Sequence, residues 1–128
     1  MTVLPPPKSL TISKKDLSIG VGESYKITMS IPNGTMCMVY KKTSKAMKYA
    51  QPIYDEVQAV TPGKINYGIQ EYPKLNELYR INKMAVYTEV DFHENPYIAK
   101  WIIEHPDVIG EALAKGVCKA YGMKYIAP

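Results

Sequence analysis

The stretch from Ala85 to Ile103, AVYTEVDFHENPYIAKWII, constrains the fold of this chain more than any other. Its apolar run predicts a strand over Ala85–Val90, which carries Glu89 to the carboxyl end. Asn95 then stands at the N-cap of a helix and Pro96 at its first position, where both residue types are favoured. The stretch therefore predicts a strand, a carboxylate, a loop and a helix. In open α/β sheets, ligands usually bind at such strand ends.

The pattern after position 34 alternates between strands and helices. Thr35–Tyr40 predicts a strand, and Ser44 is the expected N-cap of a helix that runs to about Val60. Pro52 lies inside that helix and is expected to kink or split it. The remaining expected elements are a short strand within Ile65–Ile69, a short helix over Leu75–Arg80, and helices over Pro96–Glu104 and Pro106–Tyr121. This order predicts an α/β fold with a mostly parallel sheet flanked by helices.

The first 34 residues have a different character. Pro5, Pro6 and Pro7 predict an extended lead-in. Leu10–Ile12 and Tyr25–Ile31 alternate apolar and polar residues around Gly20 and Gly22, which predicts an N-terminal β-hairpin. The string PKSLTISKKDLSIGVGESYKITMSI is similar to the opening strands of bacterial immunoglobulin-like domains. Such a sandwich needs about seven strands, so residues 1–34 are expected to be a fragment, followed by an α/β segment over residues 35–128.

From Met36 to Gly122 the chain resembles the C-terminal half of the zinc-dependent N-acetylmuramoyl-L-alanine amidases. These are cell-wall hydrolases found as bacterial autolysins and phage endolysins. The resemblance rests on YGIQEYPKLNELYRINKMAVYTEVDFHEN and IAKWIIEHPDVIGEALAKGVCKAYG. In that family a strand ending in glutamate is followed by a hydrophobic residue, a Phe and an Asn, which match Glu89, Val90, Phe92 and Asn95. The resemblance implies that Glu89 is the catalytic carboxylate of an amidase-type site. The alternative is a structural carboxylate that accepts hydrogen bonds from backbone amides at the strand end.

The zinc ligands of that family are absent from their usual places. Two His and one Glu hold the metal there, in a Gly-His-Gly-type loop and a His-x-Asn-type strand end, and neither motif occurs here. The only histidines are His93, expected in an exposed loop, and His105, expected to cap or precede the last helix. A three-ligand site made by both histidines with Glu94 or Glu89 is the alternative. No cofactor is therefore expected in this chain, although zinc serves the family it resembles.

Composition excludes several classes of function. The net charge of +4 comes from interspersed residues and predicts no nucleic-acid interface, whereas an anionic cell wall, and peptidoglycan in particular, remains a possible partner. No apolar run is long enough to cross a membrane, and the N-terminus lacks a signal-peptide pattern. Only the resemblance implies a cell-wall or extracellular location. Cys37 and Cys118 lack metal-binding spacing, and free thiols are favoured over a disulfide between them.

These observations favour a truncated or recombined peptidoglycan amidase segment that keeps Glu89, lacks the zinc site and is inactive alone. One alternative is a non-enzymatic cell-wall or structural module, or an artificial chimera. Another is a metallohydrolase whose zinc ligands come from a second chain. Missing strands would leave open sheet edges, so we expect either pairing of the hairpin with the sheet or a homo-oligomer.

Overall fold

The structure, a computed structural model, describes residues 31–81 and 83–128. The expected hairpin lies outside the described residues, apart from Ile31. The elements are β1 (Met36–Val39), α1 (Met47–Val60), β2 (Gly68–Glu71), α2 (Asn76–Tyr79), β3 (Tyr87–Glu89), α3 (Pro96–Glu104) and α4 (Pro106–Ala120). Their order confirms the expected alternation of strands and helices, with each boundary within a few residues of its expected place.

The sheet has three strands in the order β2-β1-β3. β1 and β2 are parallel, with Met36 opposite Gly68, and α1 makes the crossover that a parallel pair requires. β3 is antiparallel to β1, with Glu89 opposite Met36. The α/β class is confirmed, but the sheet is mixed rather than mostly parallel. The direction of β3 depends on contacts far apart in the sequence, which local patterns do not encode.

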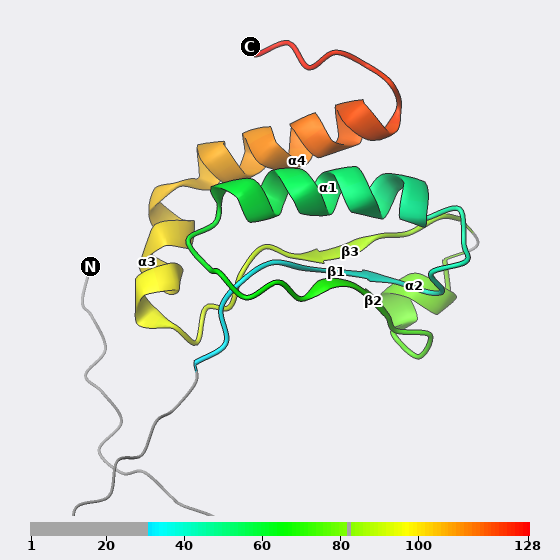
Figure 1. Cartoon of the computed structure of the whole chain (residues 1–128), viewed down its shortest axis with the longest axis horizontal. Helices are drawn as coiled ribbons and strands as arrows, with labels where there is room; N and C mark the ends of the chain where they lie inside the picture. The colour runs from blue at the N-terminus through cyan, green and yellow to red at the C-terminus, as the bar shows by residue number, and fades with distance from the viewer. Residues whose placement is uncertain (1–30, 82) are drawn as a thin grey trace, which may run out of the picture. The chain divides into compact units, whose positions relative to one another are not determined.

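The core lies between the sheet and α1. Cys37 and Val39 of β1 point toward α1, together with Ile69 of β2. Ala50 and Tyr54 of α1 meet them there. Figure 1 shows α1 lying over this face of the sheet and α4 packed along the outer side of α1. Because side chains alternate along a strand, Met36 and Met38 point to the opposite face.

The start of α1 differs from the expectation. The helix begins at Met47, and its N-cap is Ala46, which makes no side-chain capping bond. A hydrogen-bonded turn precedes it, in which the Ser44 amide donates to Lys41 O at 3.0 Å. Ala46 is already helical, at φ −62° and ψ −26°, whereas a capping residue needs an extended backbone. Ser44 does not cap the helix either, because its buried Oγ has no hydrogen-bond partner among the described residues.

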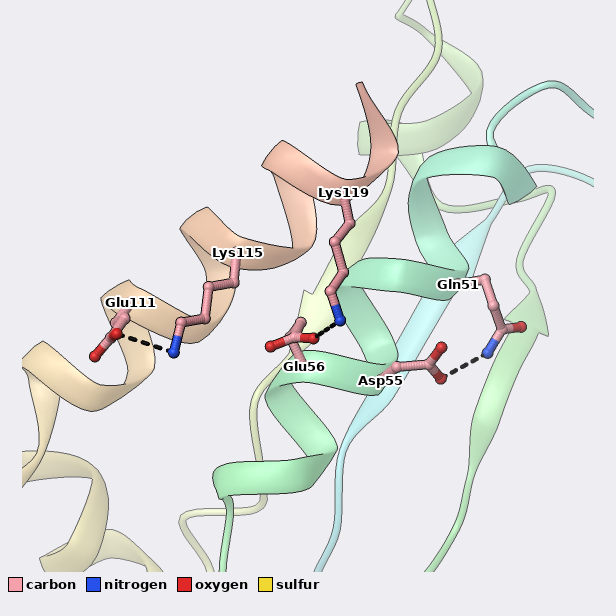
Figure 2. A network of polar contacts seen from close by, with 6 residues as sticks. All are labelled: Gln51, Asp55, Glu56, Glu111, Lys115 and Lys119. Atoms are coloured by element: carbon pink, nitrogen blue, oxygen red, sulfur yellow. Dashed lines mark hydrogen bonds and ion pairs between the residues drawn. The ribbon is translucent and has the colours of Figure 1, made fainter. Parts of the chain in front are cut away.

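α1 is not split at Pro52, which lies inside its 14 residues. Its packing against α4 is the most extensive contact between two elements of the described fold, and such packing supplies most of the stability of a helix in a protein. Figure 2 shows the polar side of this contact, where Lys119 of α4 is paired with Glu56 of α1. Glu111 and Lys115 pair within α4 at 2.9 Å. In residues 31–81 and 83–128, no helix has the length and apolar character that a membrane crossing requires.

Cys37 and Cys118 are both free, as expected. Cys37 is fully buried in β1, and its Sγ lies 3.4 Å from Thr88 Oγ1. Burial raises the pKa of the Cys37 thiol above its ordinary value of 9.0, because the thiolate would lose its hydration. The protonated thiol is thus the form that suits the folded state. Its contribution to stability is present below the ordinary pKa and is lost as the pH rises through the raised pKa.

The two thiols are therefore expected to differ in reactivity. With a disulfide reagent at pH 8, the half-buried Cys118 should react at least about tenfold faster than Cys37, since the thiolate is the nucleophile and access limits attack. The measurement is a stopped-flow thiol assay of the wild type and of Cys118→Ser. Loss of the fast phase in the variant would support this account, and an unchanged fast phase would contradict it.

Candidate functional site

Glu89 lies at the carboxyl end of β3, next to Met36 at the start of β1. Because β3 is antiparallel to β1, this edge of the sheet is the one at which β1 and β2 begin. Glu89 was expected at the carboxyl end of its own strand, and it lies there in β3. The carboxyl ends of the parallel pair, where ligands of open α/β sheets usually bind, lie at the other edge.

The Glu89 carboxylate has no polar partner within the described part of the chain. The residue is half-buried and, by strand alternation, shares its side of the sheet with Met36 and Tyr87. Among the side-chain hydrogen bonds and ion pairs of residues 31–81 and 83–128, none involves this carboxylate.

Asp91, two residues later, has the opposite character. Its carboxylate is buried and accepts three backbone hydrogen bonds. Oδ1 accepts from the amides of Gly34 at 2.6 Å and Phe92 at 2.8 Å, and Oδ2 accepts from the amide of Gly63 at 3.0 Å. The side chain thereby joins the loop before β1, the loop after α1 and the loop after β3.

Glycine is required at both distant partners of Asp91. A Cβ at Gly34, where φ is +115°, would lie 2.0 Å from Ile65 O. A Cβ at Gly63 would lie 2.4 Å from Asp91 Oδ2. The sequence signal was the pair of turns Pro32-Asn33-Gly34 and Thr61-Pro62-Gly63. These turns mark the ends of neighbouring elements, and nothing in their local pattern indicates Asp91 as the shared acceptor.

A second set of polar contacts fixes the same end of the sheet. Thr35 Oγ1 donates to Val90 O at 2.8 Å and lies 3.2 Å from Thr61 Oγ1. Gln58 of α1 accepts from the Thr35 amide at 3.0 Å and donates to Gly63 O at 2.9 Å. Together with Asp91, these contacts hold the backbone on the carboxyl side of Glu89. The free carboxylate therefore stands on a rigid support, as functional groups require.

The loop and helix after Glu89 follow the expectation. The Asn95 side chain accepts from the Tyr97 amide at 3.1 Å, and Pro96 opens α3. Asn95 is confirmed as a helix cap. Phe92 is half-buried, and its ring stacks at a tilt on Tyr67 with the ring centroids 5.3 Å apart.

The two histidines do not meet. His93 is exposed in the loop, and His105 lies between α3 and α4 with its Nδ1 2.9 Å from Trp101 O. Both expectations for these residues are confirmed. The nine residues of α3 lie between them, a length of roughly 13 Å along the axis. No group of three His, Cys, Asp or Glu residues in the described part of the chain could hold a metal. These residues therefore do not fit zinc, and the site from His93, His105 and Glu94 or Glu89 is not formed by them.

Trp101 and Arg80 lie at the surface. A large apolar side chain such as that of Trp101 is expected to pack in the core. Trp101 is instead half-buried, and its ring stacks on the His105 ring with the centroids 5.2 Å apart. Arg80 is the C-cap residue of α2. It is exposed, and its Nε donates to Tyr79 Oη at 3.0 Å.

The chain matches no protein-family model, no curated protein and no solved structure. Function is therefore inferred from the geometry around Glu89 and from the sequence resemblance.

Proposed function

We propose that this chain is the glutamate-bearing segment of a peptidoglycan amidase of the N-acetylmuramoyl-L-alanine type. One observation carries the proposal. The Glu89 carboxylate has no polar partner among the described residues, whereas the neighbouring Asp91 is fully engaged in holding the strand end in place. A carboxylate kept only for stability would be expected to have partners of this kind.

Hydrolysis of an amide needs more than this carboxylate. A general base must accept a proton from the attacking water, and in the amidases a metal held by three protein ligands activates that water. Glu89 suits the first role. The described residues do not supply the three metal ligands, so peptidoglycan is a substrate only when another polypeptide completes the site. The chain alone is expected to be inactive.

The first prediction concerns the isolated chain. Calorimetric titration with zinc should show no one-site binding in the sub-micromolar range, because the described residues bring no three ligands together. Purified cell walls should release no peptide stems on incubation with the protein and zinc. Sub-micromolar zinc at one site per chain, with release of stems, would contradict the prediction.

The second prediction tests the proposal itself by complementation. The chain is mixed with the histidine-bearing N-terminal half of an active zinc amidase, and release of peptide stems from cell walls is measured. We expect zinc-dependent release that falls about 100-fold or more with Glu89→Gln, as the loss of a general base does. Glu94→Gln, the same change at an exposed loop position, is the matched control and should keep the activity.

Three outcomes of that experiment argue against the proposal. Equal activity of Glu89→Gln and wild type would remove Glu89 from the chemistry. An inactive mixture in which the two halves associate would favour a non-enzymatic cell-wall module. Halves that do not associate would count against the amidase-type fold of the segment.

The third prediction concerns association. β2 and β3 are the outer strands of the described sheet, and exposed strand edges favour pairing with another chain. We propose that the chain forms a homodimer or a larger homo-oligomer. Light scattering at high concentration should give at least twice the monomer mass. A strictly monomeric mass would contradict this.

A further inference from the structure

The far end of the sheet from Glu89 has a cavity of about 470 Å³. Tyr40, directly after β1, and Ala46, the N-cap of α1, form one side. Leu78 and Tyr79 of α2 form a second side, and the segment 83–85 before β3 forms a third. The cavity thus lies at the carboxyl end of the central strand and at the start of α1. In open α/β sheets this crevice is the usual ligand site.

The walls of the cavity are apolar and aromatic. Leu78 is buried, whereas the residues Tyr40 and Tyr79 are 41% and 48% exposed. The Lys41 ammonium and the Arg80 guanidinium lie 5.6 Å from the centroids of these two rings. The exposed parts of the rings can still pack edge-on or offset against an apolar ring of a ligand. The cavity also has room for a small organic molecule, because its volume lies within the range of ligand pockets.

The polar groups at the cavity favour an anion. Lys45 and Lys83 line it, are exposed and form no ion pair with another described residue. None of the ten described residues that line the cavity is acidic. Ser44 also lines it, and the buried Ser44 Oγ has no hydrogen-bond partner in the described part of the chain. Buried hydroxyls are nearly always paired, so an unpaired one at a cavity suggests a missing partner.

The backbone at the start of α1 does not supply the donors. The amides of Met47, Lys48 and Tyr49 already donate to Ser44 O, Lys45 O and Ala46 O at 3.2, 3.3 and 2.9 Å. The positive end of the helix dipole still favours a negative charge nearby. Recognition of an anion therefore depends on the two lysine side chains and on Ser44.

We propose that this cavity binds a small organic anion, with a phosphate or carboxylate head between Lys45 and Lys83 and a flat apolar body against the tyrosine rings. The proposal does not depend on Glu89 or on amidase chemistry, since the site lies at the opposite end of the sheet.

The test is a titration of the full chain, labelled with ¹⁵N, followed by amide chemical shifts. The probes are phenyl phosphate, benzoate, phenol and inorganic phosphate. Phenyl phosphate or benzoate should shift the amides around Tyr40, Ala46 and Leu78, and the stronger of the two identifies the preferred head. Lys45→Gln/Lys83→Gln should weaken that binding about five- to tenfold, as expected for two exposed charge contacts. Lys64→Gln/Lys124→Gln, with the same net charge at two exposed lysines elsewhere, should change it less than about twofold.

Four results would overturn the proposal. The first is that neither aromatic anion shifts these amides. The second is that phenol binds as tightly as the anions, which would make the cavity a purely apolar groove. The third is that inorganic phosphate binds as tightly as phenyl phosphate, which would leave only the attraction of lysine charge. The fourth is that the two double lysine variants weaken binding equally. Ser44→Ala provides a further check, because loss of the hydroxyl should weaken binding while the protein stays folded.

Discussion

Asp91→Asn is expected to lower the free energy of unfolding by about 3 kcal/mol. The asparagine oxygen can still accept from the amides of Gly34 and Phe92, which meet Oδ1 of Asp91. Its amide nitrogen would then face the Gly63 N–H, so that a donor meets a donor at a buried position. One hydrogen bond to a charged group is lost, and two become weaker because their acceptor is neutral.

Urea unfolding followed by far-UV circular dichroism measures this loss. Asp55→Asn is the matched control, because the exposed Asp55 carboxylate accepts from the Gln51 side chain at 2.8 Å and from no other described residue. It should change the stability by no more than about 0.5 kcal/mol. A similarly small change for Asp91→Asn would show that the three amides find other partners and that Asp91 does not hold the strand end.

Gly116→Ala is expected to destabilise the fold by about 1–3 kcal/mol, the range for overpacking a close contact. A Cβ at Gly116 would lie 2.6 Å from Ile53 Cα and 3.0 Å from Pro52 O. Both atoms belong to the backbone of α1, so the two helices must move apart to make room. This separation would also weaken the contact between Lys119 and Glu56 (Figure 2).

Gly110→Ala is the control for this change, since it lies in the same helix and its added Cβ would meet nothing within 4 Å. Alanine is the better helix former, so this variant should be more stable than wild type by about 0.5–1 kcal/mol. Thermal or urea unfolding of both variants gives the comparison. Equal shifts in the same direction would contradict the close packing of α1 and α4.

Elements with local signals were predictable from the sequence. α3 begins at Pro96 with Asn95 as its cap because capping depends on residues within one turn. The start of α1 was predicted wrongly, because Ser44 has a residue type that favours caps but its Oγ makes no hydrogen bond to another described residue. The direction of β3 was predicted wrongly for another reason, since it is set by pairing with β1 about 50 residues earlier.

The candidate site was predictable only in part. Glu89 could be found because it ends an apolar run and matches a family motif. Asp91 could not, because its partners Gly34 and Gly63 lie 57 and 28 positions away in the sequence. A buried carboxylate that binds loop amides has no local pattern. The cavity near Lys45 and Lys83 was also missed, since it forms from segments that meet only in the folded chain.

The stability of Glu89→Gln tests most directly the central claim that Glu89 is held free for chemistry. Urea unfolding of the full chain should give a free energy within about 0.5 kcal/mol of wild type, as for residues outside packed or networked positions. The substitution removes the charge and keeps the size, so only a structural role would make it costly. A loss of about 1.5–3 kcal/mol, the range for hydrogen bonds to a charged group, would show that Glu89 is structural and would contradict the claim.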